Sequence, residues 1–176
     1  ARRLVESGVT FVTINTAPDS LCWDWHLNIV NDKRPADGSE GPSRGMDISG
    51  PPLDRMISAL VTDLYQRGLD KKVLLVVWGE FGRTPTVQGA GMDGRDHNPW
   101  GFTMWLAGAG VKAGVSHGAT DELGYQAVEN VLSVHDLNAT ILHLLGLDHE
   151  ALTFKHNGIE RRLTDVHGHV IKEILA

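Results

Sequence analysis

Acidic and imidazole side chains that can bind metal ions are grouped in three short stretches of the sequence. The first stretch is WDWH, in which a single tryptophan separates Asp24 from His26. In an extended chain, residues two positions apart point to the same side. A carboxylate and an imidazole on one side suit a zinc-like ion. The stretch therefore predicts half of a metal site, and the alternative is a hydrogen-bonded Asp–His pair in a surface turn.

The second stretch, GEFGRTP, follows an apolar run and contains both an acid and a base. Glu80 lies two residues beyond that run, at the expected carboxyl end of a strand, and is a candidate metal ligand. Arg83 could bind a tetrahedral oxyanion through two parallel hydrogen bonds. The alternative is a structural Glu80–Arg83 ion pair, with Gly79 and Gly82 allowing close approach of the backbone.

The third stretch, GRDHN, places Arg95, Asp96 and His97 in succession. We expect His97 to be a metal ligand, Asp96 to be a secondary candidate, and Arg95 to contact an oxyanion. Because His97 precedes its strand, that strand must run antiparallel to join these side chains to the other stretches, or the long loop over residues 79–101 must reach back. The alternative is a capped turn. Asp121, in a Gly-rich loop, is a further secondary candidate with a turn as its alternative.

Apolar runs along the chain predict the elements that position these side chains. We expect strands and helices, in chain order, at Val9–Ile14, Leu53–Arg67, Val73–Trp78, Phe102–Ala107, from the Ser133 cap to Leu145, and at Val170–Leu175. The continuous run Val73–Trp78 is typical of a central parallel strand. Strands that alternate with helices predict an α/β fold with three αβα layers around a mostly parallel sheet, in which ligands bind at the carboxyl ends of strands.

The remaining histidines are not expected to bind metal. His135 lies on the helix that Ser133 caps, and Asp136 occupies a position typical of a capping box. His167 and His169 are expected to be solvated.

Length and composition limit the classes of protein to consider. Residues 1–176 are expected to form one domain, with residues 31–52, rich in Gly, Pro and Ser, as a loop insertion. Residues 1–7 are typical of the last turns of a helix that Gly8 ends, which indicates that an N-terminal part of the domain is missing. The net charge of −6 argues against a nucleic-acid-binding protein. No apolar run approaches the ~20 residues of a membrane-spanning helix.

The order of the motifs resembles one protein family. WD-x-H, GEFGRTP, GRDHN, GATDE and DLNATILHLLGLD together are similar to the bacterial domain-of-unknown-function family 1501, over nearly the whole chain. The resemblance implies kinship with the sulfatases and alkaline phosphatases, which hold one or two divalent ions with Asp, His and Glu at strand ends. It also implies that this chain is the C-terminal portion of such a domain, without the nucleophile, and that the protein is exported or periplasmic.

Individual residues match parts of that enzyme pattern. Asp24 and His26 resemble an Asp and a His from the middle of such enzymes, although their spacing is tighter. Glu80 stands where those enzymes use an Asp at a strand end, which is a departure from their pattern. His97, before an apolar strand that ends in a Gly-rich turn, resembles their late histidine ligand.

The leading hypothesis is a metal-dependent hydrolase of phosphate or sulfate esters on an anionic small molecule or polysaccharide. The expected ion is zinc-like, with calcium or manganese as alternatives, and the expected ligands are Asp24, His26, Glu80 and His97. Arg83 and Arg95 would offset the charge of the anionic group. The alternative is a non-catalytic binding or structural protein that keeps a sulfatase-like fold, and a third hypothesis is a metalloprotein that stacks carbohydrate on its tryptophans.

Overall fold

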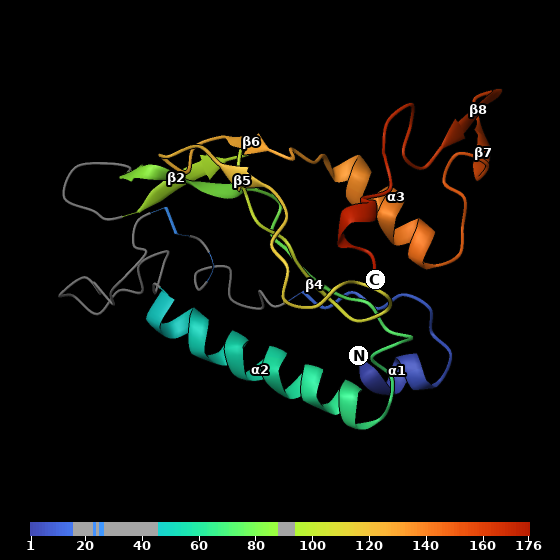
Figure 1. Ribbon diagram of the computed structural model, residues 1–176, viewed down its shortest axis with the longest axis horizontal. Helices are drawn as coiled ribbons and strands as arrows, with labels where there is room; N and C mark the ends of the chain where they lie inside the picture. The colour runs from blue at the N-terminus through green and yellow to red at the C-terminus, as the bar shows by residue number, and fades with distance from the viewer. Residues whose placement is uncertain (16–22, 24, 27–45, 88–93) are drawn as a thin grey trace. The chain divides into compact units, whose positions relative to one another are not determined.

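The computed structural model describes residues 1–15, 23, 25–26, 46–87 and 94–176, and Figure 1 traces their helices and strands. The chain divides into two compact units. The first unit comprises Ala1–Leu69 and Glu80–Phe102, and the second comprises Asp70–Gly79 and Thr103–Ala176. Each unit has its own elements and is described by itself.

The first unit contains two helices and a two-stranded hairpin. These elements are α1 (Arg2–Glu6), α2 (Met46–Gln66), β2 (Gly82–Val87) and β3 (Arg95–Asn98). The helix α2 begins at Met46 and not at the predicted Leu53, so the end of the predicted loop over residues 31–52 is helical, while residues 31–45 lie outside the described residues. Pro51 and Pro52 lie inside this helix. The prediction failed because prolines commonly mark helix boundaries, since an interior proline lacks the backbone N–H and crowds the preceding turn, yet α2 continues through both prolines despite that cost.

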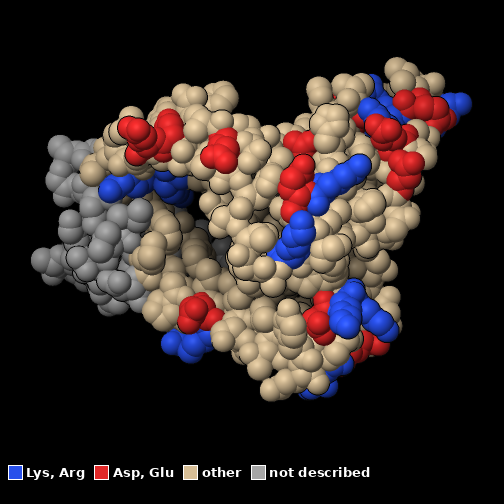
Figure 2. Space-filling view, viewed as in Figure 1, with Lys and Arg blue, Asp and Glu red and all other residues tan. Residues whose placement is uncertain are grey.

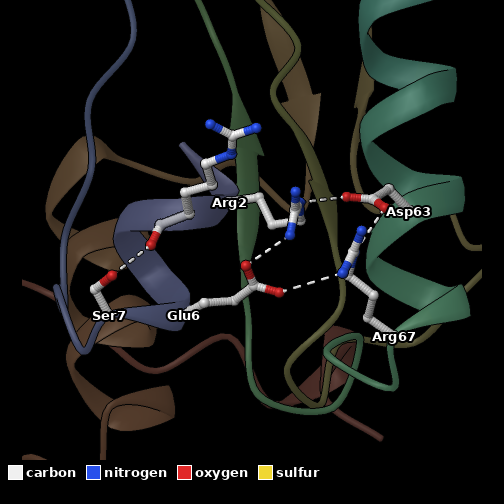
Figure 3. A network of polar contacts seen from close by, with 6 residues as sticks. Arg2, Glu6, Ser7, Asp63 and Arg67 are labelled. Atoms are coloured by element: carbon white, nitrogen blue, oxygen red, sulfur yellow. Dashed lines mark hydrogen bonds and ion pairs between the residues drawn. The ribbon is translucent and has the colours of Figure 1, made fainter.

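Charged side chains connect α1 to the C-terminal end of α2 (Figure 3). Arg2 contacts Glu6 at 2.6 Å through Nη1 and Asp63 at 2.7 Å through Nε. Arg67 contacts the other oxygens of the same two carboxylates, Asp63 at 2.7 Å and Glu6 at 3.6 Å. Each acid therefore meets both bases, and the four side chains form a closed network on the surface. On the face shown in Figure 2, acidic and basic side chains are interspersed among the described residues in the same way.

The second unit contains three antiparallel strand pairs and one longer helix. The pairs are β1 (Leu75–Val77) with β4 (Trp105–Ala107), β5 (Ala119–Thr120) with β6 (Ala127–Glu129), and β7 (Thr153–His156) with β8 (Ile159–Arg162). The helix α3 spans Val134–Leu144, and a short 3₁₀ turn, η2, spans Lys172–Ile174. Buried apolar side chains come from α3 and the last residues of the chain, namely Leu137, Ala139, Ile171 and Ile174. The core of this unit therefore lies where α3 meets the C-terminal segment.

The predicted three-layer fold with a mostly parallel sheet is wrong. The described strands form four separate two-stranded sheets, and each pair is antiparallel. The apolar run Val73–Trp78 does form a strand, β1, but its residues are only half-buried. An apolar run indicates a strand without specifying its partner or direction, so the sequence pattern could not distinguish the two pairings.

A second strand prediction also fails. Residues 9–14 form no strand, and Phe11 and Ile14 are exposed. β-Branched residues favour a strand only where a neighbouring strand and a packed face are available. Among the described residues this segment has no strand partner.

Other sequence predictions are confirmed. The helix end before Gly8 is α1, and the run Phe102–Ala107 contains β4. The Ser133–Asp136 capping box starts α3, while the predicted last helix is reduced to η2. No described helix is both long and apolar enough to cross a membrane. A single domain that lacks its N-terminal part stays a prediction.

Candidate metal centre

The β2–β3 hairpin positions the second and third predicted stretches opposite each other. Gly82 pairs with Asn98, and Arg83 pairs with His97. A Cβ atom on Gly82 would collide with the carbonyl oxygen of Gly101, so only glycine fits this closely packed end of the hairpin. Asn98 is buried there, and its Oδ1 accepts the backbone N–H of Trp100 at 3.2 Å. The register therefore fixes the backbone beneath the side chains of the hairpin.

A backbone hydrogen bond brings the first stretch to the same hairpin. The N–H of Arg95 donates to the carbonyl oxygen of Trp25 at 2.9 Å. The rings of Trp23 and Trp25 stack with centroids 6.5 Å apart, and the indole N–H of Trp25 is buried without a hydrogen-bond partner among the described atoms. His26 follows directly in the chain and thus lies next to β3.

Two imidazoles and a carboxylate meet at this place. Donor atoms of His26, Asp96 and His97 all lie within 4.8 Å of one another. Nε2 of His26 is 3.9 Å from Oδ1 of Asp96, and the rings of His26 and His97 have centroids 4.5 Å apart. The cluster is accessible, since 31% of the His26 side chain and 57% of the Asp96 side chain are exposed.

Neighbouring groups hold this cluster in place. The ring of His97 stacks on Phe81 with centroids 3.9 Å apart, which fixes the plane of the imidazole. Oδ1 of Asp96 accepts the N–H of His97 at 2.7 Å. The N–H of Asp96 donates to Oγ1 of Thr84 at 3.1 Å. Phe81 and Thr84 are contacts that sequence reasoning missed, although both lie in the GEFGRTP stretch that it singled out.

Arg83 lies at the edge of the cluster. Its Nη1 is 3.4 Å from Nδ1 of His26 and donates to the carbonyl oxygen of Arg95 at 3.1 Å. The guanidinium carbon is 5.6 Å from the centroid of the Phe81 ring. A permanent positive charge therefore stands beside the His26 imidazole, where it can attract an anionic group.

The donor set fits a divalent ion after a small adjustment. Ligand atoms around a tetrahedral zinc-type ion stand about 3.4 Å apart, and the observed limit of 4.8 Å requires the side chains to close slightly. Guanidinium groups only donate hydrogen bonds, so Arg83 favours His26 with Nδ1 as acceptor and the proton on Nε2. Binding an ion through Nε2 moves that proton to Nδ1, which requires Arg83 to withdraw from His26.

The structure brings together some of the predicted ligands. His26 and His97 meet, and the secondary candidate Asp96 joins them. Asp24 lies outside the described residues. Glu80 is exposed and is not a member of the cluster formed by the described residues. Asp96 joins the cluster because its Oδ1 turns back to accept the N–H of His97 and lies 3.9 Å from Nε2 of His26, whereas Glu80 precedes β2.

Arg95 and Asp121 contact the backbone, and the oxyanion role of Arg95 stays a prediction. Arg95 donates from Nη1 to the carbonyl oxygen of Gly94 at 3.1 Å. Asp121 lies in the turn between β5 and β6 and accepts the backbone N–H groups of Leu123, Tyr125 and Gln126. For Asp121 these contacts match the turn that was the alternative interpretation.

Comparison with known proteins identifies the family but no characterised relative. The model of the family described as "Protein of unknown function (DUF1501)" matches residues 1–175. No curated protein and no solved structure matches the chain.

Proposed function

The chain belongs to the DUF1501 family, whose description names no function, and we propose from its side-chain chemistry that it is a metal-dependent hydrolase of phosphate or sulfate esters. The convergence of His26, Asp96 and His97 beside Arg83 carries this proposal. Two imidazoles and a carboxylate are ligands typical of a catalytic zinc-type site, which keeps one position open. Kinship with sulfatases and alkaline phosphatases, which the sequence resemblance implies, would fit this chemistry.

Each part of the cluster has a task in this proposal. A bound divalent ion would polarise the ester oxygen and supply an activated water. His26, Asp96 and His97 hold the ion, and Phe81 keeps the His97 ring in one plane. Arg83, released from His26, offsets the negative charge of the phosphate or sulfate group of a small-molecule or polysaccharide ester. Manganese or calcium is the alternative ion if Asp24 adds a second carboxylate.

Metal content of the full chain tests the binding half of the proposal. The purified chain is loaded with Zn²⁺ or Mn²⁺, desalted and analysed by mass spectrometry. We expect His97→Ala to lose metal because a ligand is removed, while His156→Ala, an exposed histidine on β7, keeps it. Equal metal in wild-type and His97→Ala chains would remove His97 from the site.

Turnover of aryl phosphate and aryl sulfate esters tests the catalytic half. We expect hydrolysis that requires the ion and falls with Arg83→Gln, whereas metal affinity rises in that variant because a positive charge beside the site is gone. A folded, metal-loaded chain that hydrolyses neither ester would contradict the proposal.

Binding without turnover is the second candidate function, and one observation favours it. Among the contacts of the described residues, Thr84 brings a hydroxyl to the cluster, and its Oγ1 donates to the carbonyl oxygen of Thr86 and accepts the N–H of Asp96, both at 3.1 Å. This hydroxyl supports the hairpin and is not positioned as a nucleophile. Metal binding with no ester hydrolysis would support this candidate.

A further inference from the structure

A pocket of about 410 Å³ lies at the N-terminal end of α3, within the second unit. Three histidines are among the residues that line it: His135 from the first turn of α3, and His167 and His169 from the segment after β8. This pocket shares no residue with the His26, Asp96 and His97 cluster. The two groups of histidines are therefore separate.

A glycine brings the two chain segments together. Gly168 has φ of +93°, and a Cβ atom there would lie 2.9 Å from the carbonyl oxygen of His135 and 3.3 Å from Cβ of Ala139. Both the backbone conformation and the close approach require glycine. Because Gly168 lies against the start of α3, the two flanking histidines are held at the mouth of the same pocket.

Hydrogen bonds from α3 fix the same segment. Oδ1 of Asp136 accepts the N–H of His169 at 2.7 Å. Oγ1 of Thr140, which is fully buried, accepts the N–H of Ile171 at 3.0 Å. Oγ1 of Thr140 also donates to the carbonyl oxygen of Asp136 at 2.7 Å. The imidazoles are thus carried by backbone that is anchored in the core, which is the arrangement expected of a preorganised site.

The rings of His135 and His167 lie close enough for both side chains to reach one ion. The rings of His135 and His167 have centroids 5.2 Å apart and an interplanar angle of 61°. Two imidazoles that bind one tetrahedral ion stand with centroids about 5 Å apart, given metal–nitrogen bonds of about 2.1 Å. His135 is half-buried, and His167 and His169 are exposed, so an ion can reach all three.

The acid in the pocket supports these residues and is not itself counted as a ligand. Oδ2 of Asp136 accepts both the N–H and the Oγ–H of Ser133 at 2.7 Å, and Oδ1 accepts the N–H of His169. Its lone pairs are therefore engaged with the helix cap and the C-terminal segment. The remaining donors of the pocket are imidazole nitrogens, which suit zinc, nickel and copper better than calcium or magnesium.

We propose that this pocket is a separate binding site for a borderline-soft divalent ion of the zinc or nickel type. His135 and His167 are the nearer pair of ligands, and rotation of the imidazole side chains brings their nitrogens and a nitrogen of His169 to one ion. Water occupies the remaining position. This site is independent of the function proposed above and stands even if the first cluster binds no ion.

Zinc titration of the full chain tests this site directly. Stoichiometry and affinity are measured by equilibrium dialysis, and imidazole signals are followed by NMR. We expect zinc to shift the signals of His135, His167 and His169. Replacing a ligand in His167→Gln should weaken this binding about 100-fold or more, since loss of an outer-shell partner alone costs 10–100-fold. His143→Gln, an exposed histidine later on α3, is the matched control and should change nothing.

Two outcomes would overturn the assignment. One is equal zinc binding by the wild-type, His135→Gln and His167→Gln chains. The other is a folded wild-type chain in which zinc leaves the signals of His135 and His167 unmoved. Circular dichroism establishes that the variants are folded, and His97→Gln separates the two sites because it leaves every residue of this pocket in place.

Discussion

The hairpin cluster of the first unit and the α3 pocket of the second unit both bring histidines together, but by different means. In the hairpin, side chains half-exposed to water meet, and Asn98 beneath them is the buried residue. In the pocket, buried Thr140 and tightly packed Gly168 fix the backbone that carries the imidazoles. The pocket is therefore coupled to the stability of its unit, whereas the hairpin cluster depends on the local packing of β2 against β3.

Gly168→Ala should have the largest effect on stability. The added Cβ meets the carbonyl oxygen of His135 in a backbone conformation that alanine disfavours, so we expect a loss of about 3 kcal/mol in the free energy of unfolding. Urea unfolding measures this loss. Gly114→Ala is the matched control, because Gly114 has φ of +71° with nothing within 4 Å, and it should cost about 1 kcal/mol. Equal losses would show that Gly168 is not closely packed.

Gly82→Ala tests how far the first cluster depends on the close packing at the end of the β2–β3 hairpin. The collision with the carbonyl oxygen of Gly101 should cost about 2 kcal/mol and shift the register of β2 against β3. We expect the first cluster to lose its metal under conditions in which urea unfolding shows that the variant is still folded. In Gly50→Ala on α2, the new Cβ meets only Met46 at 3.5 Å, and stability should rise slightly. Retained metal in a destabilised Gly82→Ala chain would contradict the dependence on register.

Asp136→Asn tests how far the carboxylate of Asp136 stabilises the backbone that carries the histidines of the pocket. Burial alone raises the pKa of Asp136, but hydrogen bonds from the backbone and side chain of Ser133 and from the backbone of His169 lower it below its ordinary value of 3.8. A lowered pKa stabilises the fold above the carboxyl pKa of the unfolded chain, about 3.9, and this contribution is lost as pH falls through the folded value. We expect the variant to lose about 1 kcal/mol at pH 7 through its weaker cap. Urea unfolding at pH 7 and pH 3 should show the difference from wild type shrinking at pH 3.

Arg2→Gln probes a part of the first unit that neither site uses, and should have the smallest effect. The network of Arg2, Glu6, Asp63 and Arg67 is partly exposed, so we expect a loss of about 0.5 kcal/mol or less. The difference from wild type should vanish in 1 M salt because salt screens surface charges. Arg3→Gln on the same helix is the control. A loss that persists in high salt would indicate a packing role for Arg2.

Local signals in the sequence predicted local structure. The Ser133–Asp136 capping box predicted the start of α3, and the apolar runs predicted β1 and β4. The direction of pairing could not be predicted, because the apolar run in β1 would suit either a parallel or an antiparallel neighbour. The three-layer fold rested on that undetermined direction.

For the candidate sites, too, the sequence predicted residue types but not which side chains meet. His26 and His97 were predicted from residue type, and the WDWH and GRDHN stretches do meet. The choice of Asp96 over Glu80 depends on the hydrogen bond between Asp96 and the N–H of His97 and on the approach of His26, which residue types do not reveal. His135 and His167 were not expected to take part in a site. The sequence could not show that they meet, because their contact depends on Gly168 packing against the first turn of α3, far away in the chain.

The stacked rings of Trp23 and Trp25, one residue before His26, give the first cluster a built-in optical signal. Coupled indoles produce strong near-ultraviolet circular dichroism. A neighbouring imidazole affects indole fluorescence, and this effect should change when the imidazole binds an ion. Ion binding to that cluster can therefore be followed by circular dichroism and fluorescence of the unlabelled chain. The α3 pocket has no tryptophan in its lining, so ion binding there should leave these signals unchanged.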